Sequence, residues 1–224
     1  MSVLVFDIET VGIEWNDLSL PEQEYLLKYS KSEEEQEQEK TKLGFYPLTG
    51  KIISVAMYNP ESKRGKVFVE GTGDAKNSTS PDEDGFDYFI GDEAFILTEF
   101  WNAITKFHSY VTFNGRGFDG PYLMIRSMIN QIKPTRHLLP NRFGQEHIDL
   151  LDTMTFYGAT RKFSLDFYCR RLGITSPKSE EISGDQVAKL YNEGRLSEIA
   201  EYNKKDVIAT SELYHLYKEF LLIK

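Results

Sequence analysis

Apolar residues along the chain form short continuous runs in some segments and helically spaced positions in others. Runs rich in valine and isoleucine are typical of buried strands, whereas apolar residues three and four apart are typical of amphipathic helices. Strands are predicted at residues 2–9, 51–58, 65–71 and 109–113 and around His147. Helices are predicted at residues 93–107, from Pro121 onward, at 163–174 with an end at Gly173, at 184–194 and over the tract 197–222.

The order of these elements indicates the fold class. Residues 51–58 and 65–71 flank the turn NPESKRG and are expected to pair antiparallel. Strands come first, strand and helix then alternate, and helices end the chain. This order predicts one α/β domain over residues 1–224, with a mixed central β-sheet flanked by helices.

Two segments interrupt this pattern. Residues 14–45 form an acidic insertion that contains SEEEQEQEK, a charge run typical of a solvated helix or a mobile loop. Residues 72–87 are rich in Gly, Asn, Ser, Pro and Asp and predict a loop. Asp82, Asp84 and Glu93 have the spacing of a calcium-binding loop, but its sixth position, which requires glycine, is Asp87. A calcium site is therefore not expected.

The composition bounds the class of protein. The hydrophobic content of 40% is ample for a core, and no stretch approaches the roughly 20 apolar residues that span a bilayer. The first residues lack the pattern of a signal peptide, so a soluble, cytoplasmic protein without membrane contact is expected. Cys169 is the only cysteine, which excludes an internal disulfide and argues against a thiolate zinc site.

The net charge of −9 argues against a protein that holds nucleic acid along a broad basic face. The charge is unevenly distributed, however. Residues 1–100 hold 9 basic and 21 acidic residues, a balance of −12, whereas residues 101–224 hold 17 basic and 14 acidic residues, a balance of +3. A local basic groove in the second half is compatible with this distribution.

Asp7 and Glu9 are the first candidates for chemistry. Alternate residues of a strand share a face, so both carboxylates are expected on one side of the first strand, with Val3 and Val5 before them. Two carboxylates at the end of a buried strand repel each other unless they are protonated or share a cation. Mg²⁺ prefers such oxygen ligands, so a cation site is one interpretation of the pair. The alternative is that both carboxylates lie in solvent at the end of the strand.

The stretch FNGRGFDG, residues 113–120, combines glycines with a carboxylate. Gly115, Gly117 and Gly120 have the G-x-G-x-x-G spacing of a dinucleotide loop, which would make the protein an oxidoreductase. That function requires an acidic residue about 20 positions later, and the segment KPTRHLLPN has none. Asp119 opens the next predicted helix, where it is expected as an N-terminal cap or as a functional carboxylate.

A third acidic position lies near the end of the chain. Tyr202 and Asp206 are four residues apart in a predicted helix and therefore share a face. The pair is compatible with a core tyrosine beside a solvated aspartate and also with a joint role in a site.

Taken together, VFDIET, FNGRGFDGPYL and EYNKKDV resemble the three motifs of the DEDD superfamily of 3′-5′ exonucleases. The chain is most similar to the proofreading exonuclease domain of family B DNA polymerases and to stand-alone bacterial proteins predicted to be related to it. HIDLLDT and FSLDFYCRRLGI also resemble segments of that group. The resemblance implies a ribonuclease H-like fold.

The resemblance also implies residue roles. Four carboxylates would bind two divalent metal ions, Mg²⁺ or Mn²⁺: Asp7, Glu9, Asp119 and Asp206. Tyr202 would position the attacking water and complete the catalytic set, because a tyrosine with a pKa near 10 is a poor base at neutral pH. A sister branch has histidine where this chain has Glu201, which assigns the chain to the tyrosine branch. Thr10, Asn114 and Phe118 match positions that line the terminal nucleotide.

The implied activity is metal-dependent hydrolysis of phosphodiester bonds from the 3′ end of single-stranded nucleic acid, with DNA favoured over RNA and nucleoside 5′-monophosphates as products. Such an enzyme needs only a short basic channel, for which the candidates are Arg161, Lys162, Lys204 and Lys205. The alternative is a catalytically inactive nucleic-acid-binding or interaction module on the same fold.

Overall fold

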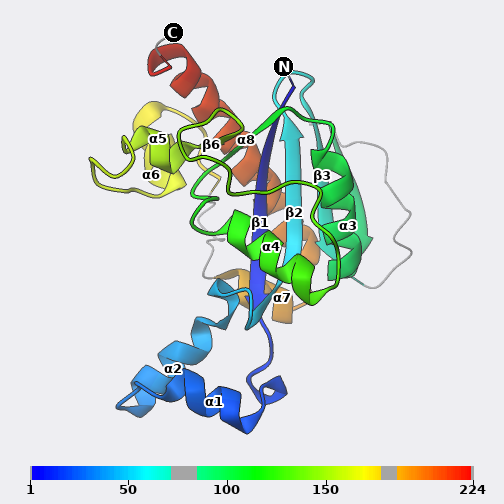
Figure 1. Ribbon diagram of the computed structural model, residues 1–224, viewed down its shortest axis with the longest axis vertical. Helices are drawn as coiled ribbons and strands as arrows, with labels where there is room; N and C mark the ends of the chain where they lie inside the picture. Colours follow the sequence, from blue (N-terminus) through cyan, green and yellow to red (C-terminus); the bar gives the residue numbers. More distant parts are fainter. Residues whose placement is uncertain (1, 72–84, 178–185, 223–224) are drawn as a thin grey trace.

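The computed structural model describes residues 2–71, 85–177 and 186–222 (Figure 1). Its strands form a six-stranded sheet in the order β4-β3-β2-β1-β5-β6. The strands are β1 (Val3–Gly12), β2 (Gly50–Asn59), β3 (Arg64–Glu70), β4 (Phe86–Gly91), β5 (Ser109–Thr112) and β6 (His147–Asp149). The pairs β1–β2 and β2–β3 are antiparallel and the remaining pairs are parallel, so the predicted mixed sheet is confirmed.

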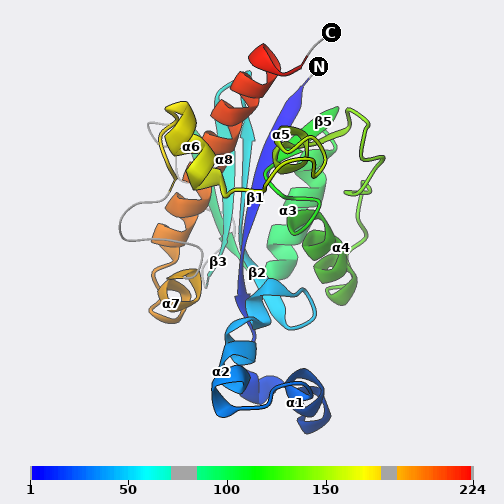
Figure 2. The ribbon, with the colours of Figure 1, turned by 90° about the vertical axis from the view of Figure 1, so that its left-hand side faces the viewer.

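Helices cover both faces of the sheet. One face is covered by α3 and α4 and the other by α6, α7 and α8, with the sheet between the two layers (Figure 2). The helices are α3 (Glu93–Ile104), α4 (Asp119–Ile129), α5 (Leu150–Met154), α6 (Leu165–Leu172), α7 (Val187–Asn192) and α8 (Leu196–Phe220). No helix in the described part of the chain is long and apolar enough to cross a membrane.

The central strand β1 separates two hydrophobic cores. Leu4, Phe6 and Ile8 pack with residues of α3 and α4, whereas Val5 packs with Val207 and other residues of α8. The alternation places Asp7 and Glu9 on the α8 side, beyond Val5, as the period of two predicts.

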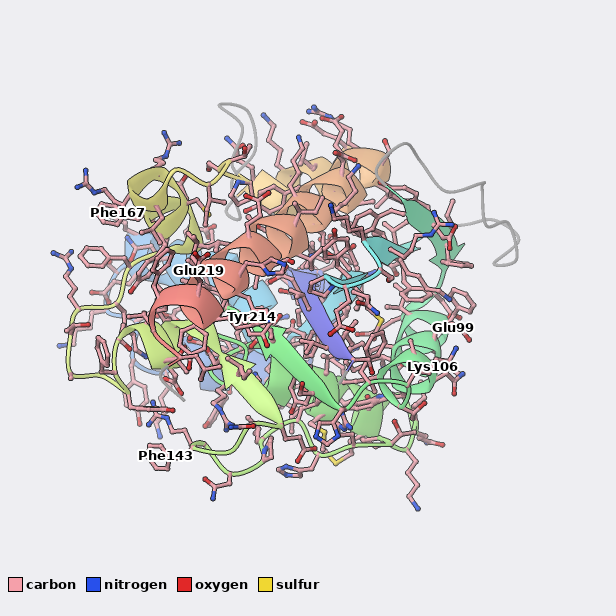
Figure 3. All side chains as sticks on the ribbon, turned by 90° about the horizontal axis from the view of Figure 1, so that it is seen from above. Glu99, Lys106, Phe143, Phe167, Tyr214 and Glu219 are labelled. Atoms are coloured by element: carbon pink, nitrogen blue, oxygen red, sulfur yellow. The ribbon has the colours of Figure 1, made fainter. Side chains whose placement is uncertain are left out.

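The long helix α8 lies along this second face. Its buried side chains include Val207, Ala209 and Leu213, and Tyr214 lies between the helix and the sheet (Figure 3). Phe143 and Phe167 lie at the periphery of the molecule instead. Packing along α8 therefore fixes the last helix against the first strand, which is the arrangement that assembles the site.

The structure differs from the sequence expectation at three elements. Strand β4 was not predicted, because its start falls in the polar segment assigned as a loop. The segment HIDLLDT forms only the three-residue strand β6, after which the chain turns at once into α5. Helix α4 begins at Asp119 rather than Pro121. Asp82 and Asp84, two positions of the rejected calcium loop, lie outside the described residues.

The acidic insertion forms an arm that projects beyond the end of β1 (Figures 1 and 2). The arm consists of a 3₁₀ turn η1 (Trp15–Asp17), helices α1 (Leu20–Leu27) and α2 (Glu33–Thr41) and a second turn η2 (Leu43–Phe45). The end of the arm, where the chain returns toward β2, is anchored to β1, because the Thr10 hydroxyl donates to the Gly44 carbonyl at 2.7 Å. A Cβ at Gly12 would lie 2.8 Å from the Cβ of Leu43, so this close crossing requires glycine.

Candidate active site

Three carboxylates meet between β1 and α8. Asp7 and Glu9 project from the same face of β1, and Asp206 projects toward them from α8. One carboxylate oxygen from each residue lies within 4.8 Å of the other two. Oxygen ligands at this separation suit a hard divalent cation such as Mg²⁺ or Mn²⁺.

Asp119 approaches the same place from the edge of β1 that pairs with β5. Strand β5 pairs with β1 only from Val3 to Val5, so the backbone of β1 continues past the end of its neighbour. The Ile8 amide, beyond the paired part, donates to Asp119 Oδ1 at 3.2 Å. The carboxylate of Asp119 therefore contacts β1 at the residue between Asp7 and Glu9, although it belongs to the first turn of α4.

The four carboxylates are electrostatically coupled. Burial raises the pKa of Asp7 well above its ordinary value, and the charge of Asp206 raises it further. Burial also raises the pKa of Glu9, with smaller contributions from Asp7, Asp206 and Asp119. Burial and then the charge of Asp7 raise the pKa of Asp119. A bound cation would relieve this repulsion, so the donor set fits a divalent metal.

Asn203 holds Asp7 in place. Its side-chain nitrogen donates to Asp7 Oδ2 at 2.7 Å, and its oxygen accepts from the Ser54 hydroxyl at 2.9 Å. Both Asn203 and Ser54 are fully buried. Because an ionised carboxylate only accepts hydrogen bonds, this chain of contacts fixes the orientation of the amide. Sequence reasoning missed Asn203, although its spacing of three from Asp206 places it near the same helix face.

Tyr202 lies one turn before Asp206 on α8 and is buried. Burial raises the pKa of Tyr202 above its ordinary value, and the charges of Asp206, Glu9 and Asp7 raise it further. The side chain therefore remains a neutral hydroxyl at neutral pH and is suited to orienting a water rather than to accepting a proton.

Glu201 and Lys204 face away from these carboxylates. The Glu201 carboxylate pairs with the Lys204 ammonium at 2.8 Å and accepts from the Tyr88 hydroxyl at 3.4 Å. Lys204 is buried and lies over the Phe86 ring. The expectation that Lys204 contacts phosphate is wrong, because burial and its ion pair hold the ammonium at the β4 side. Arg161, Lys162 and Lys205 are exposed.

The loop FNGRGFDG is organised by a fifth carboxylate, Asp149 at the end of β6. Asp149 accepts from the backbone amides of Asn114 at 2.9 Å and Arg116 at 2.8 Å. It also caps α5 through the amide of Leu151 at 3.0 Å. Burial raises the pKa of Asp149, and the amides of Arg116 and Asn114 oppose that increase. Sequence reasoning missed this residue; its only signal was an aspartate directly after a short apolar strand.

The glycines of this loop serve close packing. A Cβ at Gly115 would lie 2.3 Å from Thr112 Oγ1, and one at Gly120 would lie 3.1 Å from the Gly115 carbonyl oxygen. The left-handed position belongs to Asn114, with φ of 63°. Since Asp149 already occupies two amides of the loop, the loop does not present them to a pyrophosphate as a dinucleotide cradle would.

The three expected substrate-binding residues lie around the carboxylates but also have structural contacts. Thr10 follows Glu9 directly, at an irregularity in the β1–β2 pairing. The Asn114 carbonyl accepts from the amides of Gly117 and Phe118. The Phe118 ring packs against Tyr122, with ring centroids 5.3 Å apart. Their role toward a nucleotide stays a prediction.

Residues 49–224 match the family described as "Predicted 3'-5' exonuclease related to the exonuclease domain of PolB". The chain belongs to this family. The matched region contains Asp119, Tyr202 and Asp206 but not β1. The structure places Asp7 and Glu9 of β1 beside Asp206 and near Asp119. No curated protein matches the sequence.

A solved structure of the family B DNA polymerase from the hyperthermophilic archaeon Pyrobaculum calidifontis is similar to the chain, with a TM-score of 0.63 and 18% sequence identity. The similarity covers 98% of this chain and 25% of the polymerase chain. The chain therefore spans about a quarter of the length of that polymerase, and the likeness shows a shared fold. The mixed sheet with helices on both faces is the ribonuclease H-like fold of PolB-type exonuclease domains.

Proposed function

We propose that the protein is a two-metal-ion 3′-5′ exonuclease that acts on single-stranded nucleic acid with a free 3′ end. It hydrolyses phosphodiester bonds from that end and releases nucleoside 5′-monophosphates. The observation that carries the proposal is the group of carboxylates from β1 and α8, in which oxygens of Asp7, Glu9 and Asp206 lie within 4.8 Å of one another. Asp119 of α4 lies beside this group, because it accepts from the Ile8 amide. The preference for DNA over RNA is supported only by the likeness to a DNA polymerase.

The proposed metal ligands are Asp7, Glu9, Asp119 and Asp206. A pair of divalent ions, Mg²⁺ or Mn²⁺, supplies an activated water and neutralises charge on the phosphate oxygens. Asn203 keeps one oxygen of Asp7 hydrogen-bonded. The Ile8 amide does the same for Asp119. These contacts hold the carboxylates in place while leaving other oxygens free to bind a cation.

Tyr202 is the proposed positioning group for the attacking water. It lies one turn before Asp206 on α8, and its raised pKa keeps the proton on the hydroxyl. The phenolic oxygen retains lone pairs that accept a hydrogen bond from water. Tyr202 thus orients the nucleophile without removing its proton.

Thr10, Asn114 and Phe118 are the proposed contacts of the terminal nucleotide. Arg161, Lys162 and Lys205 are the proposed contacts of nearby phosphates, since all three are exposed. We also propose that residues 1–224 act as one exonuclease domain with an acidic insertion at about 14–45, and that the enzyme works in the cytoplasm. The sequence alone supports the location.

The test uses 5′-labelled single-stranded DNA and RNA of one sequence, incubated with the protein in Mg²⁺, Mn²⁺ or EDTA. We expect a ladder that shortens from the 3′ end, requires the metal and disappears with Asp7→Ala. Asp92→Ala is the matched control, because Asp92 is an exposed carboxylate that caps α3. Metal-independent cleavage, or cleavage unchanged by Asp7→Ala, contradicts the proposal; binding without cleavage supports the inactive module instead.

A further inference from the structure

A groove of about 740 Å³ lies between the acidic arm and the body of the protein. Its apolar lining comes from Pro21, Tyr25 and Leu26 of α1, from Tyr46 and Leu48 of the segment before β2, and from Ile125 of α4. None of the four clustered carboxylates lines it. The groove is therefore separate from the proposed active site, although the arm is anchored beside that site at Thr10.

The apolar side chains of this groove are largely exposed. The exposed fractions are 75% for Tyr25, 71% for Leu48 and 55% for Tyr46, and α1 has no buried residue. Leu20, Tyr29 and Phe45 are also exposed in the same arm. A contiguous group of exposed large apolar residues is characteristic of an interaction surface, and tyrosine is enriched at protein interfaces.

The charge around the groove selects the chemistry of the partner. Among the residues that the structure describes, Glu22 is the only charged one that lines it. Residues 14–42 hold 4 lysines and 9 acidic residues, a balance of 4 − 9 = −5. Lys40 and Lys42 are paired with glutamates of α2. This surface repels the phosphates of a nucleic acid strand and attracts cationic side chains.

We propose that the groove binds an amphipathic helix of a protein partner, with an apolar face that enters the groove and flanking Lys or Arg side chains that meet the acidic arm. A partner strand would need an open sheet edge, whereas the groove is formed by side chains of helices and a connecting segment. A helix places apolar anchors at i, i+3, i+4 and i+7, along one face that can enter an apolar groove. This surface would hold the protein to a partner without covering the carboxylates.

The test uses the full-length protein and fluorescein-labelled synthetic peptides. The probe is an 18-residue helix of Leu and Lys, with Leu along one face at i, i+3, i+4 and i+7. One control peptide has Glu in place of Lys, and another has the same composition with Leu distributed around the helix. Fluorescence anisotropy should show binding of the probe and, for either control, a Kd raised at least about 10-fold.

Substitutions locate the binding surface. Tyr25→Ala combined with Leu48→Ala should raise the Kd of the probe by about 10-fold or more, since buried anchors dominate such interfaces. Glu33→Lys combined with Glu34→Lys should also raise it. Phe220→Ala is the matched control, because Phe220 is an exposed aromatic at the end of α8. Leu48→Ala alone serves if the double variant does not fold, and exonuclease activity should be unchanged in all groove variants.

Three results would overturn the proposal. The first is equal affinity for the amphipathic peptide and its distributed-Leu control, which indicates non-specific charge attraction. The second is unchanged peptide affinity in the groove variants. The third is oligothymidylate binding that depends on Tyr25 and Leu48, which assigns the groove to the nucleic acid strand. A failure of exonuclease activity in the wild type leaves the peptide result unaffected.

Discussion

The Asn203 side chain donates to Asp7 Oδ2 at 2.7 Å across 196 positions of the chain. The second end of the amide is held by the buried Ser54 hydroxyl of β2. We predict that Asn203→Ala lowers both the apparent metal affinity and the cleavage rate by about 10–100-fold, as loss of an outer partner of a metal ligand does. Mn²⁺ titration of the cleavage rate measures this. Asn102→Ala, an exposed position on α3, is the control.

The burial of Asp7 and its repulsion by Asp206 predict that removing its charge raises stability and abolishes activity. The pKa of Asp7 is raised in the folded protein, so ionisation at neutral pH destabilises the fold. Asp7→Asn should abolish cleavage yet raise the Tm in EDTA by a few degrees, since about 1 kcal/mol corresponds to roughly 2–4 °C at this chain length. Mn²⁺ should raise the Tm of the wild type more than that of the variant. A lower Tm of Asp7→Asn in EDTA would contradict this account.

Tyr202 is predicted to orient water rather than to act as a base. Tyr202→Phe should lower kcat by about 10²-fold or less, a smaller loss than that of Asp206→Asn. Because the pKa of Tyr202 is raised, the pH–rate profile of Tyr202→Phe should have the same shape as that of the wild type between pH 6 and 9. Loss of one limb of that profile in Tyr202→Phe would assign proton transfer to the tyrosine.

Asp149 is predicted to support the loop that carries Asn114 and Asp119. Asp149→Ala leaves the amides of Asn114 and Arg116 without their acceptor, so the free energy of unfolding should fall by about 1–3 kcal/mol. The cleavage rate should fall as well, with partial rescue in Asp149→Asn, which keeps one acceptor oxygen. Asp152→Ala is the control, because its ion pair is with a half-exposed Arg142. Chemical denaturation and cleavage rates give both readouts.

His147 is predicted to make stability depend on pH. Burial lowers the pKa of His147 to about 3 in the folded protein. The unfolded chain, with a His pKa near 6.5, binds a proton that the folded chain excludes between these values. The contribution of His147 to stability is therefore fully present above pH 6.5 and should decrease as the pH falls, by up to about 1.4 kcal/mol per pH unit. His147→Gln should flatten this slope in urea unfolding.

The positions of several site residues could be predicted from the periodicity of strands and helices. The period of two on β1 placed Asp7 and Glu9 together, and the spacing of four placed Tyr202 above Asp206. The same helical geometry turns Lys204, two residues from Asp206, to a different side of α8, where it meets Glu201. The phosphate role expected of Lys204 failed because it was argued from nearness in sequence alone.

Other features depend on the relative lengths of paired strands and on contacts between residues far apart in the sequence, which no local pattern contains. Asp119 reaches the Ile8 amide because β5 stops pairing at Val5 of β1, and that relative length appears only when the sheet is assembled. Strand β4 was not predicted, because its six residues follow a segment of polar composition and directly precede the helix cap Asp92. Asp149 acts on a loop more than 30 positions before it.

The docking of α8 on β1 has a consequence for the synthesis of the protein. A ribosome releases the first strand early and the last helix late, so a nascent chain carries Asp7, Glu9 and Asp119 before Tyr202 and Asp206 exist. Under the proposed mechanism, a nascent chain that lacks α8 cannot cleave nucleic acid. Translation of α8 is therefore the step that completes the proposed site.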